Sequence, residues 1–321
     1  MLLNAGQRPV ALLTKTIDLW SSKNAFQHAG ALAFYTLFSL APLLIILITI
    51  AGAVLGEEAA RGEIAGQIDD LIGPQAAEAV QGAVSRARLS EAGLLPTALG
   101  VATLLLGSTT VFAQLQASLN QVWDVVAKPS RSSILVFLTT RLASLSLVVI
   151  IGFLLLTSFV ISMSIAAVIQ FAEEWIPVPS GVVAAIDIAA SLLIATLLFA
   201  MIFKILPDVR LHWRDMWRGA FITALLFVGG QSLISLYLTR AAPASTYGAA
   251  GSLVMVLLWV YYSSLILFFG AALTRATIGL RGDRIVPKAT AVRVKMEILE
   301  DPNERTMTKG AEVDTGRIEA S

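Results

Sequence analysis

The sequence predicts an all-α fold: a polytopic membrane helix bundle of six transmembrane helices, with both termini in the cytoplasm. Of its 321 residues, 56% are hydrophobic and only 14% are charged, and the mean hydropathy is +0.78. Soluble domains average about 25% charged residues. A chain this apolar cannot hide its surface from water, so we expect lipid to be its solvent. Six long apolar stretches and a one-sided distribution of Lys and Arg complete the prediction.

The six apolar stretches reach about the 20 residues that a helix needs to cross a bilayer. They lie at 31–55, 94–115, 135–169, 182–205, 217–238 and 248–278. In lipid every backbone polar group needs an internal partner, so each stretch is expected to be helical. Pro42 falls inside the first stretch, where it frees a carbonyl and predicts a kink. Such a kink is either static or part of a broken transport helix.

The basic residues set the expected orientation. Of 23 Lys and Arg residues, only Arg61, Arg86, Arg88 and Arg240 fall in the first, third and fifth connections. The others lie in or beside the N-terminal segment, the second and fourth connections and the tail. The positive-inside rule then places both termini in the cytoplasm.

Three parts are expected along the chain. The first is a cytoplasmic N-terminal helix lying at the membrane interface, because Val10, Leu13, Ile17 and Trp20 recur at helical spacing. The second is the transmembrane domain, whose first external connection is long and helical. The third is a polar cytoplasmic tail, expected to be disordered. Their boundaries are 1–28, 29–280 (with the external connection at 56–93) and 281–321.

The residue inventory argues against catalysis. The chain has no Cys and only two histidines, His28 and His212, which lie near different apolar stretches. No nucleophile, base and orienting group recur at catalytic spacing, and no metal-ligand cluster is evident. We therefore expect no enzyme activity, no cofactor and no metal. The net charge of +1 predicts no nucleic-acid partner.

Small and polar residues follow one face of the expected helices. In the first stretch His28, Tyr35 and Ser39 share a face, and in the second Gln114 and Ser118 do. Small residues and hydroxyls are what helices need to pack closely in lipid. Taken together, the same faces can instead line a polar cavity. Both interpretations stay open at this stage.

Four charged residues lie within or at the ends of the apolar stretches. Asp187 lies inside the fourth, and its short side chain is expected to face the bundle or water, at the outer mouth of a substrate path. Arg141, Lys204 and Arg275 lie near cytoplasmic ends. Their long side chains can reach the interface, so we expect them to act as membrane anchors.

Several short motifs resemble those of the YihY/BrkB family of bacterial inner-membrane proteins. They are HAGALAFYTLFSLAP at 28–42, LNQVWDV at 119–125, KILPD at 204–208, WRGA at 217–220, STYGA at 245–249 and LWVY at 258–261, followed by Gly270-Ala271. The resemblance runs from about residue 15 to 280, in order. The family usually has an acidic residue next, where this chain has Ala272.

The resemblance implies six spans and a location in the bacterial cytoplasmic (inner) membrane. Members have carried the name ribonuclease BN, while others are linked to serum resistance, export or lipid-linked transport. The motif positions carried over as candidate site residues are Tyr35, Pro42, Asn120, Trp123, Lys204, Pro207, Tyr247 and Trp259. They join His28, Ser39, Gln114 and Asp187 as a set expected to line a cavity or to define the family.

Three functions follow from these observations. The first is an exporter or flippase-like transporter of an unidentified solute or lipid-linked molecule. The second is a non-transporting scaffold or envelope-assembly protein, and the third and least favoured is a membrane-associated ribonuclease. The expected partners are the lipid bilayer and anionic lipid headgroups at the basic cytoplasmic ends.

Overall fold

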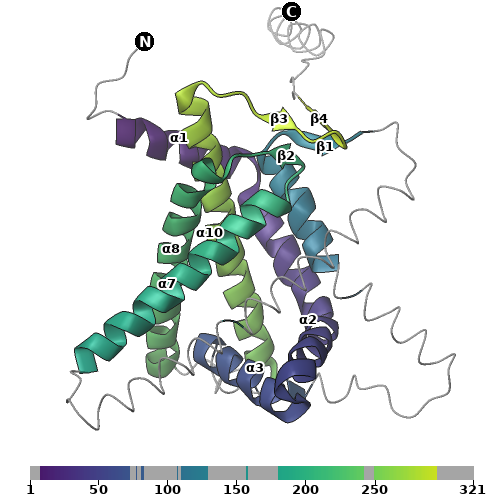
Figure 1. The fold of residues 1–321 in the computed structure, drawn as a ribbon, viewed down its shortest axis with the longest axis vertical. Helices are drawn as coiled ribbons and strands as arrows, with labels where there is room; N and C mark the ends of the chain where they lie inside the picture. Colours follow the sequence, from purple (N-terminus) through teal and green to yellow (C-terminus); the bar gives the residue numbers. More distant parts are fainter. Residues whose placement is uncertain are drawn as a thin grey trace, which may run out of the picture.

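Long helices that meet at one end form the described part of the molecule (Figure 1). The computed structural model describes residues 8–72, 110–128, 180–241 and 249–294, with single positions at 77, 81, 82, 107 and 157. The helices with defined bounds are α1 (Arg8–Ser22), α2 (Ala25–Leu55), α3 (Glu57–Ile72), α7 (Ser180–Ile205), α8 (Trp213–Ala241) and α10 (Ala249–Arg281). Residues 110–122 form a further helical segment.

Two described helices are long and apolar enough to cross a membrane, at Gly181–Ile205 and Leu253–Arg281. A third span is obtained if the two halves of α2, Ala25–Leu40 and Leu43–Thr49, count as one. Those halves are bent by 53°, and Pro42 lies in the break, as the sequence predicts. The expected third span and most of the second lie outside the described residues, so the count of six stays a prediction.

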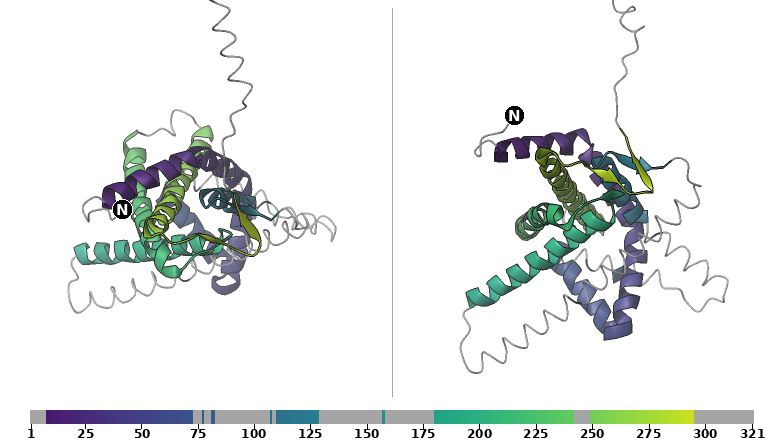
Figure 2. Two further views of the ribbon diagram at one scale, coloured as in Figure 1. Left: turned by 90° about the horizontal axis from the view of Figure 1, so that it is seen from above. Right: turned by 45° about the horizontal axis from the view of Figure 1, so that its top comes forward.

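The N-terminal helix is shorter than expected. α1 ends at Ser22, the chain turns at Asn24 in the left-handed region (φ 53°), and α2 begins at Ala25 rather than at 31. Asn tolerates this conformation better than most residues. α1 lies across the long helices (Figures 1 and 2), and its Trp20 indole donates a hydrogen bond of 3.1 Å to the Leu265 carbonyl of α10. Val10, on its other face, is 66% exposed.

Glycine and threonine alternate across the contact between α8 and α10. A Cβ on Gly270 would overlap Thr223 Oγ1, and a Cβ on Gly219 would overlap Thr274 Oγ1. Both threonine hydroxyls donate to carbonyls of their own helix, at 2.6 Å for Thr223 and 2.8 Å for Thr274. These stripes therefore bring two helix backbones close together, which is the packing role that small residues have in membranes.

The tail prediction is wrong for its first part. Residues 281–321 were expected to be disordered, but Val286–Pro287 forms β3 and Ala291–Arg293 forms β4. β4 pairs antiparallel with β1 (Val125–Ala127), and β3 pairs antiparallel with β2 (Val209–Arg210). We call residues 286–294 the strap. Backbone pairing to two chain turns orders it despite its polar composition, and residues after 294 lie outside the described part.

The densest packing lies beneath the strap. Trp123, Phe203 and Phe268, which come from three different segments, have no accessible surface or almost none. By contrast, many large side chains of α2, α7 and α8 face outward, as in Phe38 (66% exposed) and Leu193 (60% exposed). An apolar outer surface of this kind is what a bilayer requires. Both α1 and the strap lie at this densely packed end (Figure 1).

Candidate functional site

Charged side chains from three segments meet at the end of the bundle that carries the strap. The Lys23 ammonium lies 2.5 Å from Asp124 Oδ1, and the Arg275 guanidinium binds Asp124 Oδ2 and the Val122 carbonyl. Lys23 follows α1, Asp124 follows the helical segment 110–122, and Arg275 belongs to α10. We call Lys23, Asp124 and Arg275 the clasp. One carboxylate thus ties three elements together.

The local backbone places the Asp124 carboxylate. The helical segment ends with a hydrogen bond from Trp123 N to Leu119 O, and Asp124 then adopts a left-handed conformation with φ 54°. Asp is one of the few residues that visit this region readily. The Asp124 carbonyl accepts a hydrogen bond of 2.9 Å from Val294 N, so the strap also fixes this turn.

The clasp is largely shielded from solvent. The exposed fractions of the side chains are 18% for Lys23, 22% for Asp124 and 12% for Arg275. Burial alone would raise the pKa of the Asp124 carboxyl, but the hydrogen bonds and charges of Arg275 and Lys23 outweigh burial and hold that pKa below its usual value. The carboxylate therefore stays ionised at neutral pH.

A second polar cluster joins the α7–α8 connection to the helical segment. Asn120 forms two hydrogen bonds with Asp208, donating to its carboxylate at 2.9 Å and accepting from its backbone N–H at 2.8 Å. Gln116 donates to the same carboxylate at 3.4 Å. The Asp208 carbonyl accepts a hydrogen bond of 2.8 Å from Lys288 N of the strap. Asn120 is thus the residue that fixes the Pro207-Asp208 turn.

Two lysines complete this second cluster. Lys288 donates to the Ile205 carbonyl at 3.0 Å, and Lys204 donates to the Leu211 carbonyl. Burial lowers the pKa of Lys288, Asp208 opposes that shift, and the nearby charge of Lys204 adds to it. Lys204 and Arg275 were expected to act as membrane anchors, and that role stays a prediction. In the structure the Lys204 ammonium binds a carbonyl of the α7–α8 turn, and Arg275 pairs with Asp124.

A neutral polar layer lies about one to two helical turns deeper than the clasp. His28 Nδ1 lies 3.1 Å from the Ser118 hydroxyl, and Gln114 donates to that hydroxyl at 3.3 Å. The His28 ring also has Gln121 as a side-chain hydrogen-bond neighbour. Among the described residues, the buried indole nitrogen of Trp123 has no hydrogen-bond partner. A buried polar atom left unpaired costs about 1–3 kcal/mol, so this nitrogen needs a reason.

The structure brings together only part of the predicted site. His28, Gln114, Asn120, Trp123, Lys204 and Pro207 all lie at the end that carries the clasp. Ser39 is buried deeper in α2 and donates to the Tyr35 carbonyl, which is a helix-packing role. Tyr35 was expected to face inward, but its side chain is 37% exposed.

The other predicted positions lie apart or cannot be placed. Trp259 packs 5.4 Å from Phe227 in a separate aromatic group. Tyr247 lies outside the described residues. Pro42 and Asp187 lie in α2 and α7, but their side chains fall outside the described part, so the proposed role of Asp187 stays a prediction.

Sequence reasoning left Lys23, Asp124 and Asp208 out of the candidate site, and it gave Arg275 only as a membrane anchor. Asp124 and Asp208 do occur within the family motifs, immediately after Trp123 and Pro207. A usable signal was present, since two motifs from different parts of the chain each contain an Asp, at Asp124 and Asp208. What the sequence could not supply was the pairing.

The carboxylates of Asp124 and Asp208 are both engaged in contacts that hold segments of the chain together. The Asp124 carboxylate is occupied by two cations and the Asp208 carboxylate by two amides. Over the described ranges, no group of three or more His, Asp or Glu side chains is arranged to hold a metal ion. The arrangement holds helices, turns and strap together.

Apolar spans, outward-facing hydrophobic side chains and a polar closure at one end define an integral membrane protein of the α-helical class. The chain belongs to the family whose model is described as virulence factor BrkB, which matches residues 16–293. The resemblance drawn from the motifs is thereby confirmed.

Relatives from several bacteria carry the name UPF0761 membrane protein. The one from Pseudoalteromonas atlantica is 28% identical over 250 residues, covering 77% of this chain and 79% of that protein. The one from Mannheimia succiniciproducens is 25% identical over 279 residues, covering 84% of this chain and 91% of that protein. No solved structure matches the chain.

Proposed function

We propose that this protein is an exporter or flippase-like transporter in the bacterial inner membrane, and that the clasp is its cytoplasmic gate. In this proposal both termini face the cytoplasm and six helices cross the membrane. The substrate is a solute or lipid-linked molecule that remains to be identified. No catalytic reaction and no cofactor are part of the proposal.

The observation that carries the proposal is the clasp itself. A half-buried ion pair adds little stability compared with apolar packing, because desolvation offsets the Coulomb attraction. Its best-attested use is to select one arrangement over another. When one carboxylate holds three elements, its ion pairs either join all three or free them together. Alternating access requires such a two-state gate at each end of a transport path.

The neutral layer behind the clasp supports the same proposal. His28, Ser118 and Gln114 present polar atoms to the bundle interior. The unpaired indole N–H of Trp123 can donate a hydrogen bond to water or to a passing solute once the clasp opens.

A non-transporting scaffold is the second candidate. It is favoured by the strap, because two strand pairs lock the turns beside the clasp and a permanently closed end would serve assembly equally well. The two functions differ in whether the closed end ever opens.

Reconstitution tests the proposal. Purified protein in liposomes is screened for flux of lipid-linked intermediates, siderophores and small anions, beside the Asp124→Asn variant and empty liposomes. We expect at least one class to move, at a rate that changes when the clasp is broken. The scaffold function gains if no class moves in any sample while the protein is folded and correctly inserted.

A further inference from the structure

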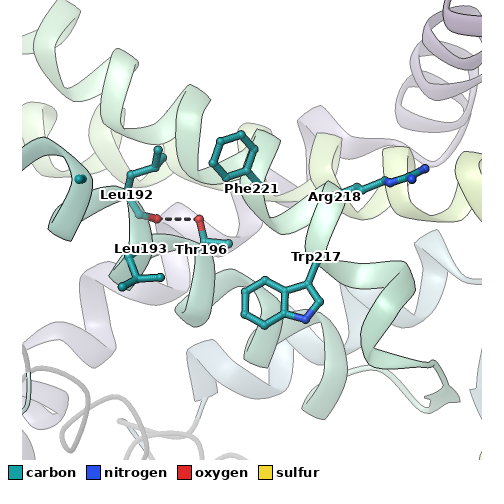
Figure 3. Close-up of a pocket in the computed structure, with 7 residues that line it drawn as sticks. Leu192, Leu193, Thr196, Trp217, Arg218 and Phe221 are labelled. Carbon is teal, nitrogen blue, oxygen red and sulfur yellow. Dashed lines mark hydrogen bonds between the residues drawn. The ribbon is translucent and has the colours of Figure 1, made fainter.

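An apolar groove runs along the outer surface between α7 and α8. It has a volume of about 500 Å³ and is lined by Ala189, Leu192, Leu193, Thr196, Trp217, Arg218 and Phe221. Trp217 and Phe221 of α8 face Leu192 and Leu193 of α7, and the Arg218 side chain extends at the edge (Figure 3). The volume falls within the range of small-molecule sites, about 300–1,000 Å³.

The walls of the groove are mostly apolar. Besides Trp217 and Arg218, the polar side chain in its lining is Thr196, whose hydroxyl donates to the Leu192 carbonyl at 2.6 Å. Leu193 is 60% exposed, Phe221 47% and Trp217 41%. In a bilayer this surface faces hydrocarbon, so an acyl chain is the occupant that fits it.

The edge of the groove is basic. Arg218 is exposed and has no ion-pair partner within the described part of the chain, and Asp215, the nearest acidic residue along α8, is paired with Arg281 at 2.8 Å. Arg210 and Arg214 are exposed at the α7–α8 connection. Guanidinium groups bind phosphate oxygens with two parallel hydrogen bonds.

The position of Arg218 suits a lipid headgroup. It lies five residues into α8, about 7.5 Å along the helix from Trp213. Exposed Trp side chains at this level are typical of the membrane–water interface. The groove therefore matches a phospholipid in two respects: its apolar walls suit an acyl chain, and its basic edge suits the phosphate.

We propose that the α7–α8 groove holds a bound anionic phospholipid, with one acyl chain along Leu193 and Phe221 and the phosphate on Arg218. This site lies on the outer surface of the bundle and does not depend on whether the protein transports anything. Its specificity for negative charge comes from Arg218, and its affinity for lipid in general comes from the apolar walls.

Native mass spectrometry of the full chain, released from mixed micelles, tests the site. The probes are dioleoylphosphatidylglycerol and dioleoylphosphatidylcholine at equal concentration. The wild type is expected to retain phosphatidylglycerol preferentially. Arg218→Gln should reduce that preference about five-fold, since one basic residue at a membrane surface contributes roughly that factor. Leu193→Trp should fill the groove and reduce retention of both lipids.

Matched controls make the test decisive. Arg284→Gln removes an exposed basic residue outside the groove, and Leu233→Trp enlarges an exposed leucine of α8 that does not line it. Neither control should change lipid retention. The proposal is overturned if Arg218→Gln keeps the wild-type preference, or if Arg284→Gln lowers it equally, which would mean diffuse attraction to the basic surface.

Discussion

Removing the charge of Asp124 should release the clasp. Asp124→Asn keeps the size of the side chain but leaves Lys23 and Arg275 without their carboxylate. Breaking a buried pair by removing one partner costs about 3–5 kcal/mol, whereas an exposed pair contributes about 0–1 kcal/mol. The clasp side chains are 12–22% exposed, so we expect a loss of about 2–3 kcal/mol, between those limits.

Asp215→Asn is the matched control. It breaks the pair between Asp215, whose side chain is 16% exposed, and Arg281, whose side chain is 39% exposed. Because this carboxylate has one Arg partner and that Arg reaches solvent, the loss should be smaller, about 1 kcal/mol. The free energy of unfolding is measured in mixed micelles by titration with SDS. Tryptophan fluorescence follows it, with the fully buried Trp123 beside the clasp.

Equal losses for the two variants would refute the reasoning. That result would mean that the second cation and the stronger shielding of Arg275 add nothing to the clasp, and that apolar packing alone holds its three elements. The most direct support would come from hydrogen exchange. In Asp124→Asn, backbone amides near Val122 should exchange faster, while those elsewhere in the protein exchange as in the wild type.

Three further predictions concern the packing, the pH dependence and the strap. Gly270→Leu should cost about 1–3 kcal/mol or more, because the side chain would overlap Thr223, whereas Gly229→Leu has open space and should cost little; unfolding in SDS compares the two. Because the folded pKa of Asp124 lies below the usual 3.8, the clasp stabilises the protein above that value and loses its contribution as the pH falls through the folded pKa. An acid titration of stability should show this limb in the wild type and not in Asp124→Asn. Deleting 285–321 removes the β1–β4 and β2–β3 pairings and three further backbone hydrogen bonds between the strap and the rest of the chain, at about 1 kcal/mol each. Thermal melting should show a clear loss, and deletion of 295–321 alone should not.

The apolar helices were the part of the fold that the sequence predicted well. Hydropathy predicted α7 and α10 to within a few residues, because a bilayer imposes length and composition on every span. Pro42 predicted the bend of α2 for an equally local reason. The boundary between α1 and α2 was missed, since it depends on a single left-handed residue, Asn24, which hydropathy does not detect.

The sequence predicted only part of the site. It identified motif residues such as Asn120 and Trp123, but it did not predict which residues they contact. Arg275 lies 151 residues along the chain from Asp124, and the Lys288 ammonium lies 83 residues from the Ile205 carbonyl to which it donates. No local pattern encodes such pairings. The strap was missed for the same reason, because its strands are two or three residues long and form only by pairing with distant turns.

The central claim is that the clasp closes a cytoplasmic path, and one accessibility measurement tests it. The chain has no cysteine, so Ser118→Cys introduces a single thiol behind the clasp, at a position with no exposed surface. In inverted membrane vesicles a membrane-impermeant thiol reagent should modify it slowly, and at least about ten-fold faster when Asp124→Asn is added, corresponding to about 1.4 kcal/mol. Val126→Cys, at a side chain 46% exposed beside the clasp, is the positive control for sidedness. An equally slow reaction at Ser118→Cys with and without the clasp, while Val126→Cys reacts readily, would contradict the gate.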